Sequence, residues 1–140
     1  DRIPTDATRV SKITTGTYNE RMYYKITYKT NYRDYMVLAD NLLTSNDYEF
    51  SLHSNALGLQ NGEYVTDVRL EFPQASPGFT QTKSMRVFCQ VLPSLPKDYR
   101  ITNRADVGGR YGNEWESATT SWNTTVWTNE TTTPLPKTGY

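Results

Sequence analysis

The chain has 140 residues, which is enough for one domain built around one hydrophobic core. Its 15 Lys and Arg residues equal its 15 Asp and Glu residues, and the resulting zero formal charge argues against a nucleic-acid or anionic-membrane surface. A mean hydropathy of −0.73, with no long apolar run, excludes a membrane-spanning helix.

Short strands account for most of the chain. Residues 1–7 read as a linker, and from Thr8 onward β-branched and aromatic residues alternate with polar ones between recurring turn clusters. No stretch has convincing helical periodicity, and residues 35–43 come nearest to it. We predict strands over residues 8–13, 21–30, 35–39, 48–52, 64–72, 83–92, 98–107 and 115–128.

Two glycine-containing pairs predict turns between strands. Asn61-Gly62 favours a type I′ hairpin turn, because both residue types tolerate a positive φ. Gly108-Gly109 predicts the turn that follows the strand ending at Val107.

The succession of strands without helices between them predicts an all-β fold. For residues 8–128 we favour an antiparallel immunoglobulin-like β-sandwich, with a closed barrel as the alternative. Residues 129–140 change composition to Asn, Glu, Thr and Pro, which cannot bury a core, so we predict an extended C-terminal stem there.

The only cysteine and the only histidine suggest no catalytic or metal site. Cys89 cannot form an internal disulfide, and its alternating apolar surroundings predict a buried structural thiol. His53 stands in a polar stretch without a second ligand or base nearby, so we expect a solvated surface histidine. Because no catalytic dyad, metal-ligand spacing or Gly-rich phosphate loop is evident, we predict no cofactor and no enzymatic activity.

A five-residue motif near the C-terminus carries the clearest functional signal. Leu135, Pro136, Lys137, Thr138 and Gly139 spell L-P-x-T-G directly after a Thr-rich stretch, and they resemble the sorting signal of Gram-positive surface proteins. The resemblance implies that a sortase cysteine attacks the Thr138 carbonyl, releases Gly139, and passes Thr138 to an amine on peptidoglycan or on a neighbouring pilin. It therefore implies an extracellular, wall-anchored protein, with sortase as a transient partner and peptidoglycan as a covalent one.

The sorting motif should be extended and exposed, because Pro136 fixes φ and resists helix formation. In the family an apolar segment and basic residues follow the motif, whereas this sequence ends at Tyr140. The N-terminus carries no signal peptide, so we expect export to be encoded upstream. The alternative is an ordinary Pro-rich tail or an added ligation tag.

A second resemblance covers most of residues 8–128. The stretches 24–32, 62–66 continuing to Gly78-Phe79, and 103–109 look like the repeat modules of long Gram-positive cell-wall proteins and pilin shafts. The resemblance implies a stalk module that adjoins neighbouring modules in a tandem array. It also raises the question of an intramolecular crosslink, since many such modules join a Lys of the first strand to an Asn near the last by a self-formed amide.

The strand pattern permits such an isopeptide bond between Lys12 and Asn103. Asn103 shares parity with Ile101, and Lys12 shares parity with Val10, so both side chains are predicted to point inward. An apolar setting would favour the neutral amine, which could then attack the Asn103 carboxamide.

A buried acid would have to polarise that carboxamide. Asp40 is the first candidate and Glu71 the second. In the alternative interpretation Lys12 keeps its ammonium group in solvent at a sheet edge and Asn103 makes ordinary hydrogen bonds.

Two functions compete on these observations. The first is a structural stalk whose only chemistry is that of a sortase substrate. The second is an adhesin module that binds a host glycan or protein through exposed aromatics, which the 11 Tyr residues and Trp115, Trp122 and Trp127 make worth weighing. Most Tyr residues occupy regular strand positions, where core packing explains them.

Overall fold

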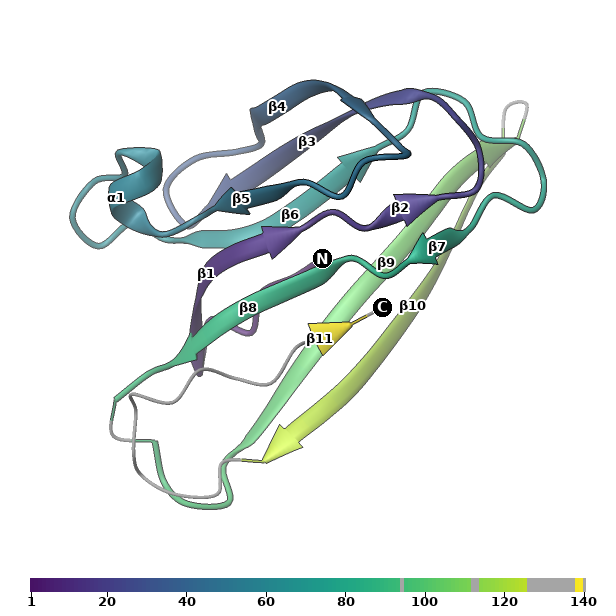
Figure 1. Ribbon diagram of the computed structural model, residues 1–140. Helices are drawn as coiled ribbons and strands as arrows, with labels where there is room; N and C mark the ends of the chain where they lie inside the picture. Colours follow the sequence, from purple (N-terminus) through teal and green to yellow (C-terminus); the bar gives the residue numbers. More distant parts are fainter. Residues whose placement is uncertain (94, 112–113, 126–137, 140) are drawn as a thin grey trace.

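The structure is a computed structural model that describes residues 1–93, 95–111, 114–125 and 138–139, with side chains described as far as residue 109. Within those ranges the chain forms eleven strands and one short helix, and every strand pair is antiparallel (Figure 1). The predicted all-β class is therefore confirmed. The immunoglobulin-like connection of the strands stays a prediction.

The first sheet has β1 at its centre. β1 (Thr8–Thr14) pairs on one side with β5 (Glu49–Ser51) and on the other with β8 (Arg86–Val91). The outer edge of β8 pairs with the two-residue strand β11 (Thr138–Gly139), drawn in yellow in Figure 1. The strand order is thus β11-β8-β1-β5.

The second sheet has the order β4-β3-β6. Its central strand, β3 (Tyr23–Thr30), lies between β4 (Met36–Leu43) and β6 (Val65–Glu71). A short pair, β2 (Thr17–Tyr18) and β7 (Gln81–Lys83), forms a separate two-stranded sheet.

β9 (Arg100–Tyr111) and β10 (Glu114–Thr125) form a long antiparallel hairpin that runs beside the other strands in Figure 1. Their register is continuous, and it places Gly108 and Gly109 inside β9, opposite residues of β10. The predicted turn at Gly108-Gly109 is therefore wrong, because the strand continues through both glycines to Tyr111.

Residues 1–3 connect this hairpin to the second sheet. The Arg2 backbone N–H donates to the Arg104 carbonyl of β9 (3.0 Å), and the Ile3 N–H donates to the Thr66 carbonyl of β6 (2.8 Å). Ile3 and Ala7 are buried. This segment is thus hydrogen-bonded to two strands and contributes to the core, while its predicted role as a linker to a preceding domain stays a prediction.

One buried cluster joins the two larger sheets. Apolar side chains from β1 and β8 meet those from β3 and β6, so burial of both sheet faces in a common core stabilises the fold. The most deeply buried large aliphatic side chains of the cluster are Ile13, Ile26, Leu52, Val65, Val68 and Val87.

Cys89 lies in the same core and has no disulfide. Burial raises the pKa of its thiol to about 11, which leaves it protonated and unreactive at neutral pH. The predicted buried structural thiol is confirmed.

The turn at Asn61-Gly62 exists but does not join a hairpin. The Glu63 N–H donates to the Gln60 carbonyl (3.0 Å), and of the two central residues only Gly62 has a positive φ, as in a type II turn. The strands on either side, β5 and β6, pair with β1 and β3 rather than with each other. The predicted type I′ hairpin is therefore wrong.

Candidate functional site

The structure places Thr138 and Gly139, between which the cleavage point is predicted, on a sheet edge. Thr138 lies opposite Val87 of β8, and Gly139 lies opposite Arg86. Residues 135–137 lie outside the described residues. The expectation of a peptide free of the domain is wrong for Thr138 and Gly139, because the outer strand β8 offers backbone donors and acceptors that an extended segment can satisfy.

That pairing is short. It spans two residues, on one side only. Each hydrogen bond in such a ladder contributes about 1 kcal/mol net, so β11 is held much less firmly than the core strands. Release of Thr138 and Gly139 from β8 therefore requires little free energy.

Lys12 does not enter the core. Its side chain is 41% exposed, and Nζ lies 3.1 Å from Glu49 Oε1 and 4.8 Å from the centre of the Phe88 ring. The β1–β8 register explains the direction, since Val10 pairs with Cys89 and Lys12 pairs with Phe88. Ser11 is thus an extra residue, a β-bulge that reverses the parity on which the prediction rested. The prediction of an inward Lys12 is wrong.

Asn103 is buried, 3% exposed, as its parity in β9 predicts. Neither candidate acid is fully buried. Asp40 is exposed, and its Oδ1 accepts a hydrogen bond from the Asn41 N–H (2.8 Å). Glu71 accepts a hydrogen bond from the Thr27 hydroxyl (3.0 Å). The structure therefore does not assemble the buried amine and buried acid that the Lys12–Asn103 bond requires.

Glu63 is a buried acid that the sequence analysis missed. It is 2% exposed, and its Oε2 accepts hydrogen bonds from the Thr30 hydroxyl (2.6 Å) and from Arg33 Nε (2.8 Å). Its Oε1 accepts from Arg33 Nη2 and from the Gln60 N–H, both at 3.0 Å. The hydrogen bonds from Arg33, Thr30 and Gln60 lower the pKa of Glu63 to about 2. The carboxylate thus fastens the turn at residues 60–63 to the end of β3.

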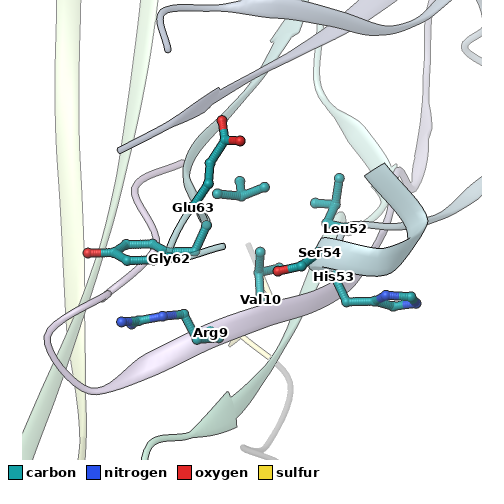
Figure 2. A pocket seen from close by; sticks show the side chains of 9 residues that line it. Arg9, Val10, Leu52, His53, Ser54, Gly62 and Glu63 are labelled. Atoms are coloured by element: carbon teal, nitrogen blue, oxygen red, sulfur yellow. The ribbon is translucent and has the colours of Figure 1, made fainter. Parts of the chain in front are cut away.

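A pocket of about 350 Å³ lies between β1, the start of helix α1 (Ser54–Leu57), and residues 62–65. Apolar side chains of Val10, Leu52 and Val65 line it together with the polar side chains of Arg9 and His53. In Figure 2, Val10 lies between Arg9 and His53, while the carboxylate of Glu63 points away from Arg9. The pocket therefore has polar groups on two sides of an apolar centre.

His53 is exposed, as predicted, and it also caps α1. Its Nδ1 accepts a hydrogen bond from the Ala56 N–H (3.2 Å), while Gly58 ends the helix in a left-handed conformation. Because Nδ1 acts as the acceptor, Nε2 carries the ring proton and can donate to a ligand.

The described tyrosines range from buried through partly buried to exposed. Tyr18, Tyr24 and Tyr28 are buried, in agreement with the predicted packing role, whereas Tyr23 and Tyr32 are 52% and 53% exposed. The side chains of Trp115, Trp122 and Trp127 lie outside the described residues. Among the described aromatic side chains, the hypothesis of binding through exposed aromatics therefore rests on Tyr23 and Tyr32.

Over the described part of the chain, no group of three His, Cys, Asp or Glu residues is arranged to hold a metal ion. No helix in those ranges has the length and apolar character to cross a membrane. Comparison with known proteins finds no family model, no curated protein and no solved structure that matches the chain.

Proposed function

We propose that the chain is a structural module of a bacterial surface protein, which a sortase anchors covalently to peptidoglycan through Thr138. The observation that carries the proposal is the L-P-K-T-G sequence at residues 135–139, next to a Thr-rich stretch. The compact all-β body supports it, because a stalk module needs a stable fold and no catalytic centre. We further propose that the body has immunoglobulin-like sandwich topology and adjoins similar modules.

The chain's chemical part in this function is that of an acyl donor. The sortase thiolate attacks the Thr138 carbonyl carbon, and the Thr138–Gly139 bond breaks as a proton is delivered to the departing Gly139 amine. An amine on the wall then attacks the thioester, forms an amide with Thr138, and releases the thiolate. Because the enzyme must enclose the extended peptide, β11 has to leave β8 before the first attack.

The test is a transpeptidation assay on the whole chain. The domain is incubated with a housekeeping sortase and triglycine, and intact mass is measured. The expected product loses Gly139 and Tyr140 and gains triglycine. Thr138→Ala should abolish transfer, while Lys137→Ala, a change at the variable position of the motif, should retain it. Absence of transfer from both the domain and a free peptide of residues 129–140 would overturn the proposal.

The isopeptide bond is not part of this proposal, because Lys12 is exposed and paired with Glu49. The alternative function, an adhesin that binds a host glycan or protein through exposed aromatics, would have to use Tyr23, Tyr32 or the tryptophans. Neither Tyr23 nor Tyr32 lines the pocket. We therefore rank the structural module first.

A further inference from the structure

We propose that the pocket beside Arg9 is a binding site for a small carboxylate with a compact body, such as an acylated amino acid or a sugar acid. Arg9 would hold the carboxylate, and the apolar centre of the pocket would receive the body. This inference does not depend on the anchoring function, because it uses no residue of the sorting motif.

Arg9 is held in place before any ligand arrives. Its Nη1 donates to the carbonyl oxygens of Thr5 (2.6 Å) and Thr8 (2.8 Å). The guanidinium carbon lies 3.7 Å from the centre of the Tyr64 ring, which is cation–π stacking distance. A side chain fixed in this way loses little conformational entropy when it binds a partner.

The Nε and Nη2 edge of the Arg9 guanidinium makes no hydrogen bond within the described residues. Both hydrogen bonds of Arg9 use Nη1, and within the described ranges neither Nε nor Nη2 has an acidic partner. Nε and Nη2 together form the fork that binds a carboxylate through two parallel hydrogen bonds. The same chain shows that arrangement at Arg33, whose Nε and Nη2 lie 2.8 and 3.0 Å from the Glu63 carboxylate. Arg9 has the same pair of donors, Nε and Nη2, but no carboxylate bound to them within the described residues.

The charge of the pocket favours an anion. Glu63 also lines it, but all four of its hydrogen bonds are made within the chain and Arg33 neutralises its charge. The pocket lining therefore has no unpaired acid to compensate the cation of Arg9, and a carboxylate ligand would supply one.

The remaining lining fits the body of such a ligand. Val10, Leu52 and Val65 offer apolar contact, while the Ser54 hydroxyl and His53 Nε2 offer hydrogen bonds away from Arg9. A volume of about 350 Å³ lies at the lower end of the range for small-molecule sites, which suits a single acylated residue or one sugar ring.

Matched acids and amides test the inference on the whole chain. Two acids, N-acetylalanine and glucuronic acid, are titrated into the ¹⁵N-labelled protein, and each is compared with its uncharged amide. We expect at least one of the two acids to shift the resonances of Arg9 Nε–H, His53 and the backbone N–H groups of Tyr64 and Val65. The uncharged amide of that acid should shift the same resonances far less. The acid that binds identifies the source of the carboxylate.

Two substitutions at one position separate charge from geometry. Arg9→Gln should lower the affinity about tenfold or more, because it removes both the charge and the charge-assisted hydrogen bonds. Arg9→Lys keeps the charge but not the fork, and it should still weaken binding severalfold. Arg21→Gln is the matched control, since Arg21 also lies over a tyrosine ring, that of Tyr23, but outside the pocket.

Several outcomes would overturn the inference. These are no shifts with either acid, equal shifts with acid and amide, shifts centred away from the pocket, or unchanged affinity in a folded Arg9→Gln variant. The comparison of acid with amide uses the unaltered chain, so it decides the question even if Arg9→Gln does not fold.

Discussion

Arg33 and Glu63 form a bidentate ion pair in which the arginine is partly exposed and the carboxylate is fully buried. This geometry makes the fold sensitive to acid. The pKa of Glu63 is lowered from 4.5 to about 2, so the ionised form contributes stability that is fully present above the ordinary carboxyl pKa and is lost as the pH falls toward 2.

The urea concentration at the unfolding midpoint should therefore decrease as the pH is lowered from 5 to 2. In Glu63→Gln the midpoint should be lower at pH 6 than in the unaltered chain, and it should depend less on pH through this window. Glu49→Gln is the control, because Glu49 pairs with Lys12 at the exposed surface and surface pairs contribute little. Equal pH dependence in all three proteins would contradict the assignment to Glu63.

Gly16 should tolerate no side chain. Its φ is +71°, and an added Cβ would lie 2.2 Å from the Lys83 carbonyl oxygen. We expect Gly16→Ala to destabilise the fold by about 2–5 kcal/mol, from the left-handed backbone together with the clash. Gly58→Ala, at φ +62° with no atom within 4 Å of the added Cβ, should cost only the backbone term of about 1–2 kcal/mol. Urea denaturation of both variants measures the two losses of unfolding free energy. Equal losses would show that backbone strain alone matters and that the clash at Gly16 contributes nothing.

The shared core should dominate the stability. Ile13→Ala and Ile26→Ala remove fully buried side chains from the two sheets that meet there, and each should cost about 2–5 kcal/mol. Val37→Ala, at a side chain that is 57% exposed, should change the free energy of unfolding by less than about 0.5 kcal/mol. A loss at Ile13 without a loss at Ile26 would mean that the sheets do not unfold together.

Pairing of β11 with β8 should slow the sortase. A contribution of about 1 kcal/mol from each of the two residue pairs, about 2 kcal/mol together, predicts cleavage of the domain roughly thirty times more slowly than cleavage of a free peptide of residues 129–140. The measurement is kcat/KM for both substrates under identical conditions. Equal values would show that Thr138 and Gly139 do not stay on β8 in solution.

Lys12 should retain its amine. Intact mass should equal the sequence mass, without the loss of ammonia that an amide to Asn103 would cause. Lys12→Ala should destabilise by less than about 1 kcal/mol, as expected for an exposed ion pair. A crosslink would instead contribute about 4–5 kcal/mol on the loop-entropy account. A loss of that size in Lys12→Ala, together with a mass lower by one ammonia in the unaltered chain, would show that the Lys12–Asn103 amide forms.

Side-chain direction could be predicted from the sequence where a strand runs without interruption. Asn103 and Ile101 are both buried in β9, as their shared parity predicts. The prediction failed at Lys12 because Ser11 forms a bulge against β8. A bulge depends on the partner strand, which a local alternation pattern does not contain.

The second sheet gives the same lesson. Lys29 pairs with Asp67 and Thr30 pairs with Val65, so Thr66 is an extra residue in β6. Val65 and Val68 both enter the core as a result, although they have opposite parity. The sequence correctly predicted that a strand lies there, and the pairing decided which of its faces is buried.

The pocket could not be predicted because it depends on residues that lie far apart in the chain. Arg9 and Tyr64 meet only when β1 and the start of β6 come together around the core. The burial of Cys89 and the exposure of His53 could be predicted, because each follows from local hydropathy alone. No local sequence motif predicts that the Arg9 side chain is held in place by Thr5, Thr8 and Tyr64.

The placement of residues 1–3 between β6 and β9 has a mechanical consequence. Tension applied to the N-terminal segment must shear hydrogen bonds to two flanking strands at once, whereas tension applied at Thr138 peels a two-residue contact from one flank. A pull along the chain would thus free the C-terminal end first and leave the body intact. Under the proposed attachment through Thr138, tension would separate β11 from β8 before it disturbed the core.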